Sequence, residues 1–145
     1  MLQVQTSIEI AATAERVWQI LTDFAAYPAW NPFVRSIAGE QRPGSQLSVT
    51  IQPVGGRAMP IRPKLLVFDT RKELRWKGML LFPGIFDGEH YFRLTEPAPG
   101  RVLLSHGEIF SGMLVPLVMR GSLRSGTERG FAAMNEALRQ RAEAQ

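Results

Sequence analysis

The chain has 145 residues, about the length of one ordinary domain. Its composition, 45% hydrophobic and 21% charged, is typical of globular proteins and favours neither a disordered nor a membrane class. There is no cysteine, which excludes disulfides, a thiol nucleophile and thiolate metal ligands. The net charge is +4, yet the basic residues form no tight cluster, so nucleic acid is not an expected partner.

Residues 2–10 alternate between apolar and polar side chains, which predicts a half-buried strand. The same stretch has neither the basic start nor the apolar block of a secretory signal. No apolar run approaches the roughly 20 residues that span a bilayer. We therefore expect a cytoplasmic protein without stable membrane insertion, formed as a single domain over residues 1–145.

A short helix is predicted next, because Thr13 can cap its first turn and its apolar face recurs at helical spacing. Pro28 and Pro32 prevent this helix from continuing. A second short helix or turn is expected around residues 27–31. The residues of the first apolar face are Val17, Ile20, Leu21 and Phe24.

Strand patterns separated by turn residues follow. Proline and glycine mark the breaks between them, and the short connections favour an antiparallel meander. The predicted strands cover residues 34–41, 46–52, 61–70, 73–81, 86–96 and 101–111.

The last third of the chain, residues 112–145, has the period of one long amphipathic helix. Gly121, Gly126 and Gly130 should each destabilise a helix interior by roughly 1 kcal/mol relative to Ala. Either this helix packs closely against the rest of the protein, or it is broken at residues 116–121 into a short and a long piece. Its apolar stripe consists of Val115, Met119, Leu123, Thr127, Phe131, Met134 and Leu138.

The predicted element order is one strand, two short helices, six strands and a long helix. The economical α+β arrangement is a curved seven-stranded antiparallel sheet with the long helix against its concave face. One helix does not fill the space enclosed by a strongly curved sheet. A cavity between sheet and helix is therefore expected, and such clefts are the usual ligand sites.

Six segments of the chain are informative together: AERVW (14–18), DF (23–24), YP (27–28), WNPF (30–33), LRWKG (74–78) and HGEIFSG (106–112). They resemble the polyketide cyclase/dehydrase and lipid-transport superfamily, also called SRPBCC. This superfamily includes START lipid-transfer domains, birch-pollen-allergen-like proteins, aromatic polyketide cyclases and coenzyme-Q-binding proteins. The resemblance covers essentially the whole chain, including the closing amphipathic helix.

The resemblance implies a helix-grip fold with a hydrophobic cavity between the sheet and the C-terminal helix. It also implies a small hydrophobic partner such as a lipid, quinone, polyketide or other aromatic molecule, and no general cofactor. A minority of the superfamily catalyses cyclisation or dehydration, so a cyclase/dehydratase remains an alternative. A protein-interaction module of the coenzyme-Q-chaperone or chaperone-activator type is the other alternative.

Candidate ligand-binding residues come from the aromatic cluster after the first helix, the inward faces of the strands and the helix stripe. The aromatic cluster either wedges the short helices against the sheet or forms a pocket wall. The strand at 73–81 places alternate residues on one face. The expected ligand-binding residues are Tyr27, Trp30, Phe33, Trp76, Gly78, Leu80, Phe92, Leu94, Phe110, Val115, Met119, Leu123, Thr127 and Phe131.

The strongest polar candidates are His90, His106 and Glu108 in the predicted hairpin. With a turn at residues 97–99, His90 lies opposite His106 and all three side chains point into the cavity. A loop one residue longer would place the histidines on opposite faces. Such a set can transfer protons as catalytic acid and base, or it can anchor a ligand head group. No metal site is expected, because the three residues match no recognised ligand motif.

Overall fold

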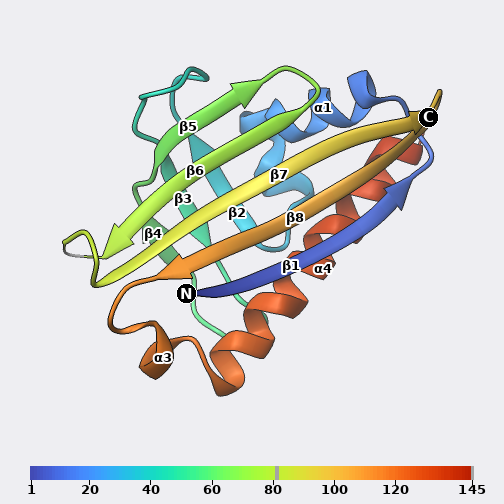
Figure 1. The fold of residues 1–145 in the computed structure, drawn as a ribbon. Helices are drawn as coiled ribbons and strands as arrows, with labels where there is room; N and C mark the ends of the chain where they lie inside the picture. The colour runs from blue at the N-terminus through green and yellow to red at the C-terminus, as the bar shows by residue number, and fades with distance from the viewer. Residues whose placement is uncertain (81, 145) are drawn as a thin grey trace.

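The computed structural model of the chain describes residues 1–80 and 82–144, with the side chain of Leu80 left out. Figure 1 shows a broad sheet crossing the molecule, with further strands and the long C-terminal helix behind it. The elements are β1 (Leu2–Ile10), α1 (Ala14–Thr22), η1 (Phe24–Ala26), α2 (Tyr27–Trp30), β2 (Val34–Ala38), β3 (Ser48–Ile51), β4 (Met59–Ile61), β5 (Lys64–Asp69), β6 (Glu73–Leu80), β7 (Phe86–Ala98), β8 (Arg101–Ser111), α3 (Val115–Val118) and α4 (Gly121–Glu143).

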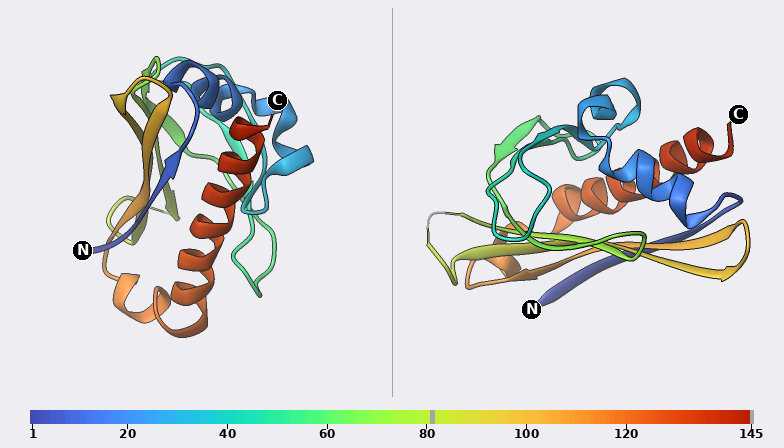
Figure 2. Two further views of the ribbon diagram at one scale, coloured as in Figure 1. Left: turned by 90° about the vertical axis from the view of Figure 1, so that its right-hand side faces the viewer. Right: turned by 90° about the horizontal axis from the view of Figure 1, so that it is seen from above.

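The strands form an antiparallel five-stranded sheet of order β1-β8-β7-β6-β5 and a three-stranded sheet of order β2-β3-β4. Residues 44–47 join them, since the amide of Leu47 donates to the carbonyl of Pro63 and Gln46 bridges to Lys64. Figure 2 shows the five-stranded sheet along one side of α4 and the β2–β4 region curving round the other. The expected α+β helix-grip arrangement is confirmed.

The strand count differs from the prediction, which was seven. The described residues form eight strands, because the strand predicted at 61–70 is divided at Arg62–Pro63. Proline has no N–H to give to a β-ladder, so it favours a break between strands. β4 then pairs with β3, whereas β5 pairs with β6. Leu81, the predicted end of β6, lies outside the described residues.

The helix predicted over residues 112–145 is also divided. α3 ends at Val118, Arg120 is extended, and Gly121 starts α4 with a φ of 59°. The break expected at residues 116–121 is therefore observed. Gln145 lies outside the described residues. Within residues 1–80 and 82–144, no helix combines the length and the apolar composition needed to cross a bilayer.

Two glycines of α4 allow close contact with the segments just before β2 and just after β3. The carbonyl of Gly126 accepts a hydrogen bond from the amide of Val54 at 3.0 Å. A Cβ at Gly130 would lie 2.5 Å from Cδ1 of Phe33, which is too close for any real side chain. The helix tolerates these residues because each lets a neighbour approach the backbone. Thr13 caps α1 as expected, its hydroxyl accepting from the amide of Arg16 at 3.1 Å.

We expect Gly130→Ala to destabilise the protein by about 1–3 kcal/mol, because the added methyl group overpacks the contact with Phe33. Helix propensity alone predicts the opposite, a stabilisation of about 1 kcal/mol. Urea unfolding measures the change. Ala132→Gly, at an exposed position of the same helix, is the matched control and should lose about 1 kcal/mol. A more stable Gly130→Ala variant would contradict the close contact.

Candidate functional site

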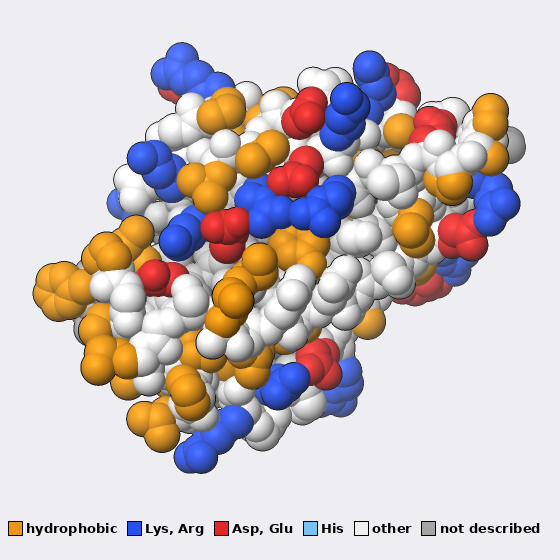
Figure 3. All heavy atoms as spheres, in the orientation of Figure 1, with side chains coloured by type: hydrophobic (Ala, Val, Ile, Leu, Met, Phe, Trp, Pro, Cys, Tyr) orange, Lys and Arg blue, Asp and Glu red, His pale blue; other side chains and the backbone are white. Residues whose placement is uncertain are grey.

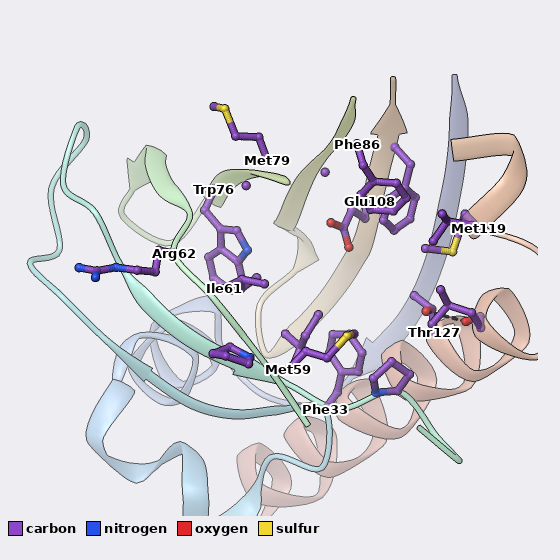
Figure 4. A pocket seen from close by; sticks show the side chains of 18 residues that line it. Phe33, Met59, Ile61, Arg62, Trp76, Met79, Phe86, Glu108, Met119 and Thr127 are labelled. Atoms are coloured by element: carbon purple, nitrogen blue, oxygen red, sulfur yellow. Dashed lines mark hydrogen bonds between the residues drawn. The ribbon is translucent and has the colours of Figure 1, made fainter. Parts of the chain in front are cut away.

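A cavity of about 520 Å³ lies between the curved sheet and α4. Figure 4 shows its walls, with aromatic and aliphatic side chains converging from several strands and from the helix. Both sheets contribute, so the cavity exists only because they curve round α4. Its lining residues are Phe33, Ile51, Pro53, Met59, Pro60, Ile61, Arg62, Trp76, Gly78, Met79, Phe86, Gly88, Glu108, Phe110, Val118, Met119, Leu123 and Thr127.

Glu108 is the charged side chain that points inward. In Figure 4 its carboxyl group faces the cavity, whereas Arg62 extends away from it. Gly88, on the neighbouring strand, makes room for this carboxyl group, because a Cβ there would overlap Oε2 of Glu108. The arrangement sets one carboxyl group in a mostly apolar wall, in which the hydroxyl of Thr127 already donates to the carbonyl of Leu123.

A chain of hydrogen bonds runs from Glu108 into the core. Oε1 of Glu108 lies 3.1 Å from Nδ1 of His90, and Nε2 of His90 lies 2.7 Å from Nε2 of His106. Nδ1 of His106 lies 2.7 Å from Oδ1 of Asn135, whose Nδ2 donates to the hydroxyl of Thr6 at 2.8 Å. The Thr6 hydroxyl donates in turn to the carbonyl of His106 at 2.8 Å. Side chains from β1, β7, β8 and α4 are thereby connected.

The hairpin register differs from the predicted one. His90 pairs with Glu108, and Phe92 pairs with His106, whereas His90 was expected opposite His106. The turn lies at Pro99–Gly100, where Gly100 has a φ of 75°, and the register shifts between Thr95 and Ala98. The error is two residues, and a shift of two keeps every side chain on its face. The three polar residues therefore still meet.

His106 has no exposed surface. Burial lowers its pKa well below the ordinary histidine value, and the neighbouring His90 lowers it further, while the hydrogen bond with Asn135 opposes both effects. Its ring stacks on Phe131 with the ring centroids 4.3 Å apart, and the Phe92 ring lies 4.3 Å away. His106 is consequently a neutral imidazole inside an aromatic shell.

His90 is separated from the cavity by two aromatic rings. Trp76 stacks on it with centroids 5.0 Å apart and planes at 17°, and Phe33 stacks with centroids 6.2 Å apart. Trp76 and Phe33 are themselves lining residues. The side chain of His90 is 3% exposed and that of Glu108 is 16% exposed. His90 itself does not line the cavity, but it contacts Glu108, which does.

The predicted ligand-binding residues fall into two groups. Those that line the cavity are Phe33, Trp76, Gly78, Phe110, Met119, Leu123 and Thr127. The others do not line it, because they lie one packing layer deeper or elsewhere in the fold; they are Tyr27, Trp30, Phe92, Leu94, Val115 and Phe131.

The structure shows where two of the residues outside the cavity lie and what they contact. The hydroxyl of Tyr27 donates to the carbonyl of Leu21 and joins α2 to α1. Trp30 borders a separate polar surface pocket beside Arg16 and Arg141. The side chain of Leu80 lies outside the described part of the chain, so the structure does not place it.

Sequence reasoning missed Thr6 and Asn135. One signal was present, since Thr6 is a polar residue on the apolar face of the first predicted strand. Asn135 directly follows Met134 of the helix stripe, and nothing in the pattern marks it. Part of the cavity wall was missed too, because Met59, Pro60 and Ile61 were assigned to a break or to the start of a long strand.

The cavity mouth has an exposed apolar rim, formed by Met79, Phe82, Met113, Leu117 and Val118. Met113 is 71% exposed, Phe82 69% and Leu117 62%. Figure 3 shows hydrophobic side chains gathered over the β6–β7 turn and α3. Backbone hydrogen bonds from Met113 to Gly84 and from Leu114 to Ile85 hold these two segments together. Met79 and Val118 also line the cavity, so the rim continues into it.

Metal binding has no support in this geometry. Among the residues that the structure describes, no group of three His, Asp or Glu side chains is arranged to hold a metal ion. The Glu108 carboxyl group and the two histidines instead hydrogen-bond one another in sequence.

The fold is that of the START-like helix-grip proteins. A family model described as polyketide cyclase/dehydrase and lipid transport matches residues 1–143, so the chain belongs to this family. A comparison with curated protein sequences finds no match.

Solved structures share the fold. A START superfamily protein from Mycobacterium smegmatis is 22% identical with a TM-score of 0.74, and the match covers 97% of each chain. An aromatase/cyclase from a Streptomyces species is 19% identical with a TM-score of 0.75 over 98% of this chain and 93% of its own. A Helicobacter pylori protein reaches a TM-score of 0.78 at 15% identity, over 98% of this chain and 88% of its own. At these identities the likeness concerns the fold alone.

Burial of neutral His106 should make stability fall in mild acid. Its pKa is lower in the folded than in the unfolded state, so the unfolded state takes up the proton first as pH drops below about 6.5. We expect His106 to remove about 1 kcal/mol from the free energy of unfolding between pH 6.5 and 5.5.

The measurement is urea unfolding at both pH values for the wild type and for His106→Phe. The variant suits the aromatic surroundings and cannot titrate at this position. The variant should be less stable than the wild type at both pH values, because His90 and Asn135 lose their hydrogen-bond partner. Its free energy of unfolding should fall by about 1 kcal/mol less than that of the wild type between the two pH values. Parallel stability curves for the two proteins would contradict a neutral buried His106.

Proposed function

We propose that this protein binds a small hydrophobic molecule in the cavity between the curved sheet and α4. The observation that carries the proposal is the cavity of about 520 Å³ with aromatic and aliphatic walls and one inward-facing carboxyl group. Ligand sites in proteins are mostly apolar, with a few polar groups that orient the bound molecule. The walls of this cavity have the composition expected of a ligand site.

The walls favour a ligand with a ring system. Phe33, Trp76, Phe86 and Phe110 contribute aromatic faces and edges to the cavity. Such faces favour offset-stacked or edge-to-face contacts with an aromatic ligand, in addition to the gain from burying apolar area. The exposed apolar rim supports the same proposal, because a hydrophobic molecule can pass from it into the cavity without crossing a polar surface.

The relatives support this class of ligand. The family description names polyketides and lipid transport, and one structural neighbour is an aromatase/cyclase. Aromatic polyketides, quinones and lipids are therefore the chemical classes to test first. The protein-interaction alternative would use the exposed rim, but it gives no role to a cavity with an inward carboxyl group.

A second candidate function is acid–base catalysis of cyclisation or dehydration. The specific observation in its favour is that the carboxyl group facing the cavity is backed by two histidines at 3.1 and 2.7 Å. A histidine behind a carboxyl group can exchange a proton with it and so supply or remove a proton at the cavity surface. Glu108 would contact the substrate, and His90 and His106 would act through it.

Filling the cavity should abolish binding without unfolding the protein. Gly78 has space beside it, since the nearest atom to an added Cβ is 3.7 Å away on Pro63. We expect Gly78→Leu to reduce the bound fraction of ligand at least tenfold, measured by native mass spectrometry followed by organic extraction. Ser7→Leu, at an exposed position of β1, should bind like the wild type. If the wild-type protein takes up none of the lipids, quinones or aromatic polyketides offered, the proposed binding function is contradicted.

The catalytic alternative makes a separate claim. With an identified substrate, Glu108→Gln should lower turnover by roughly a hundredfold or more, because general acid–base groups typically contribute that much. Binding of the same substrate should change by less than about threefold, because Gln keeps the size and polarity of Glu. Unchanged turnover in this variant would remove Glu108 from the mechanism and leave a binding protein.

A further inference from the structure

The direction of the buried hydrogen-bond chain can be read from its inner end. The hydroxyl of Thr6 lies 2.8 Å from the backbone carbonyl of His106. A carbonyl oxygen only accepts, so Thr6 must use its one hydrogen there. The Thr6 oxygen is then free to accept, and the amide nitrogen of Asn135 donates to it at 2.8 Å.

The hydrogen bonds of Thr6 and Asn135 determine which ring nitrogens of His106 and His90 carry a hydrogen. With its nitrogen turned to Thr6, Asn135 presents Oδ1 to Nδ1 of His106 at 2.7 Å, so Nδ1 carries a hydrogen. Neutral His106 therefore has a lone pair on Nε2. Nε2 of His90, 2.7 Å away, must donate to it.

One proton then lies between His90 and Glu108. Across their 3.1 Å contact, either an imidazolium donates to a carboxylate or a carboxylic acid donates to a neutral imidazole. Both arrangements contain the same number of protons, and in both the pair has no net charge. That neutrality suits a pair behind apolar walls, where an isolated carboxylate would be strongly disfavoured.

The same proton count determines which hydrogen-bonding group the cavity presents to a ligand. Oε1 of Glu108 is occupied by His90, and any carboxyl proton lies on that side. Oε2, beside Gly88 of the cavity wall, is left as an acceptor in both arrangements. A ligand hydroxyl placed there gains a hydrogen bond, whereas a ligand ketone places two accepting oxygens face to face.

We propose that the ligand is an apolar ring system bearing a hydroxyl donor that binds Oε2 of Glu108, and that Thr6 and Asn135 are positioning residues that impose this arrangement. The inference rests on the proposed function, since it names the ligand of that cavity. It goes further because it assigns the polar end of the ligand and gives roles to two residues that do not touch it.

Three probes of one skeleton test the ligand: 9-fluorenol, 9-fluorenone and fluorene. Isothermal titration calorimetry of the wild type should show 9-fluorenol binding about tenfold tighter than 9-fluorenone, the value of one net hydrogen bond. Glu108→Leu should lose this preference while still binding fluorene. Equal affinities, or a preference for the ketone, would overturn the inference and leave the proposed function intact. Failure of all three probes to bind would count against both.

Glu108→Gln reports the direction of the chain. If His90 donates to His106, its Nδ1 accepts from the amide nitrogen of the new glutamine, whose oxygen then faces the cavity. The preference for 9-fluorenol should therefore persist in this variant. The opposite direction would turn the amide nitrogen towards the cavity, so a switch of preference to 9-fluorenone would contradict the assigned roles of Thr6 and Asn135.

A test without ligand uses the fact that the chain has two histidines. Nitrogen-15 NMR of the side chains should show His106 protonated on Nδ1 and His90 protonated on Nε2. Thr6→Val removes the hydroxyl that orients Asn135 and should abolish the fixed His106 tautomer, whereas Thr6→Ser should retain it. A wild-type His106 protonated on Nε2 alone, or the same tautomer in both variants, would overturn the positioning roles.

Discussion

The need to satisfy a fully buried histidine organises this protein. His106 has no exposed surface, and a buried ring nitrogen without a partner would cost about 1–3 kcal/mol. Its partners come from β7 and α4, and Asn135 of α4 must also reach Thr6 of β1. These bonds restrict where α4 can lie along the sheet. The contact that stabilises the core therefore also determines the position of the wall of the cavity.

An apolar cavity and a polar chain coexist here because aromatic rings separate them. Trp76 and Phe33 stack on His90 and also line the cavity. Glu108 is the point at which the polar chain reaches the surface of the cavity, in the space that Gly88 provides. One carboxyl group in an apolar wall can orient a ligand without making the cavity generally hydrophilic.

Turn residues and side-chain periods were enough to predict most of the fold. The strand at 101–111 has the predicted bounds, and the helix-grip order is confirmed. The errors arose where a local sequence pattern is compatible with two different structures. Pro63 divides a predicted strand. The turn at Pro99–Gly100, together with the irregularity between Thr95 and Ala98, shifts the hairpin register by two residues. That shift kept Glu108 on its face, because strand side chains alternate with a period of two.

Local periods and turns were enough to predict the order of the elements and the face on which each side chain lies, and sequence motifs were enough to identify the family resemblance. The tertiary structure decided how deep each residue lies. Phe131 and Leu123 belong to one helix stripe, yet Phe131 packs on His106 and Leu123 lines the cavity. Thr6 and Asn135 meet across 129 positions of the chain. A period specifies a direction from the backbone, but only the separation and curvature of the packed layers decide which side chains fill the core and which surround a cavity.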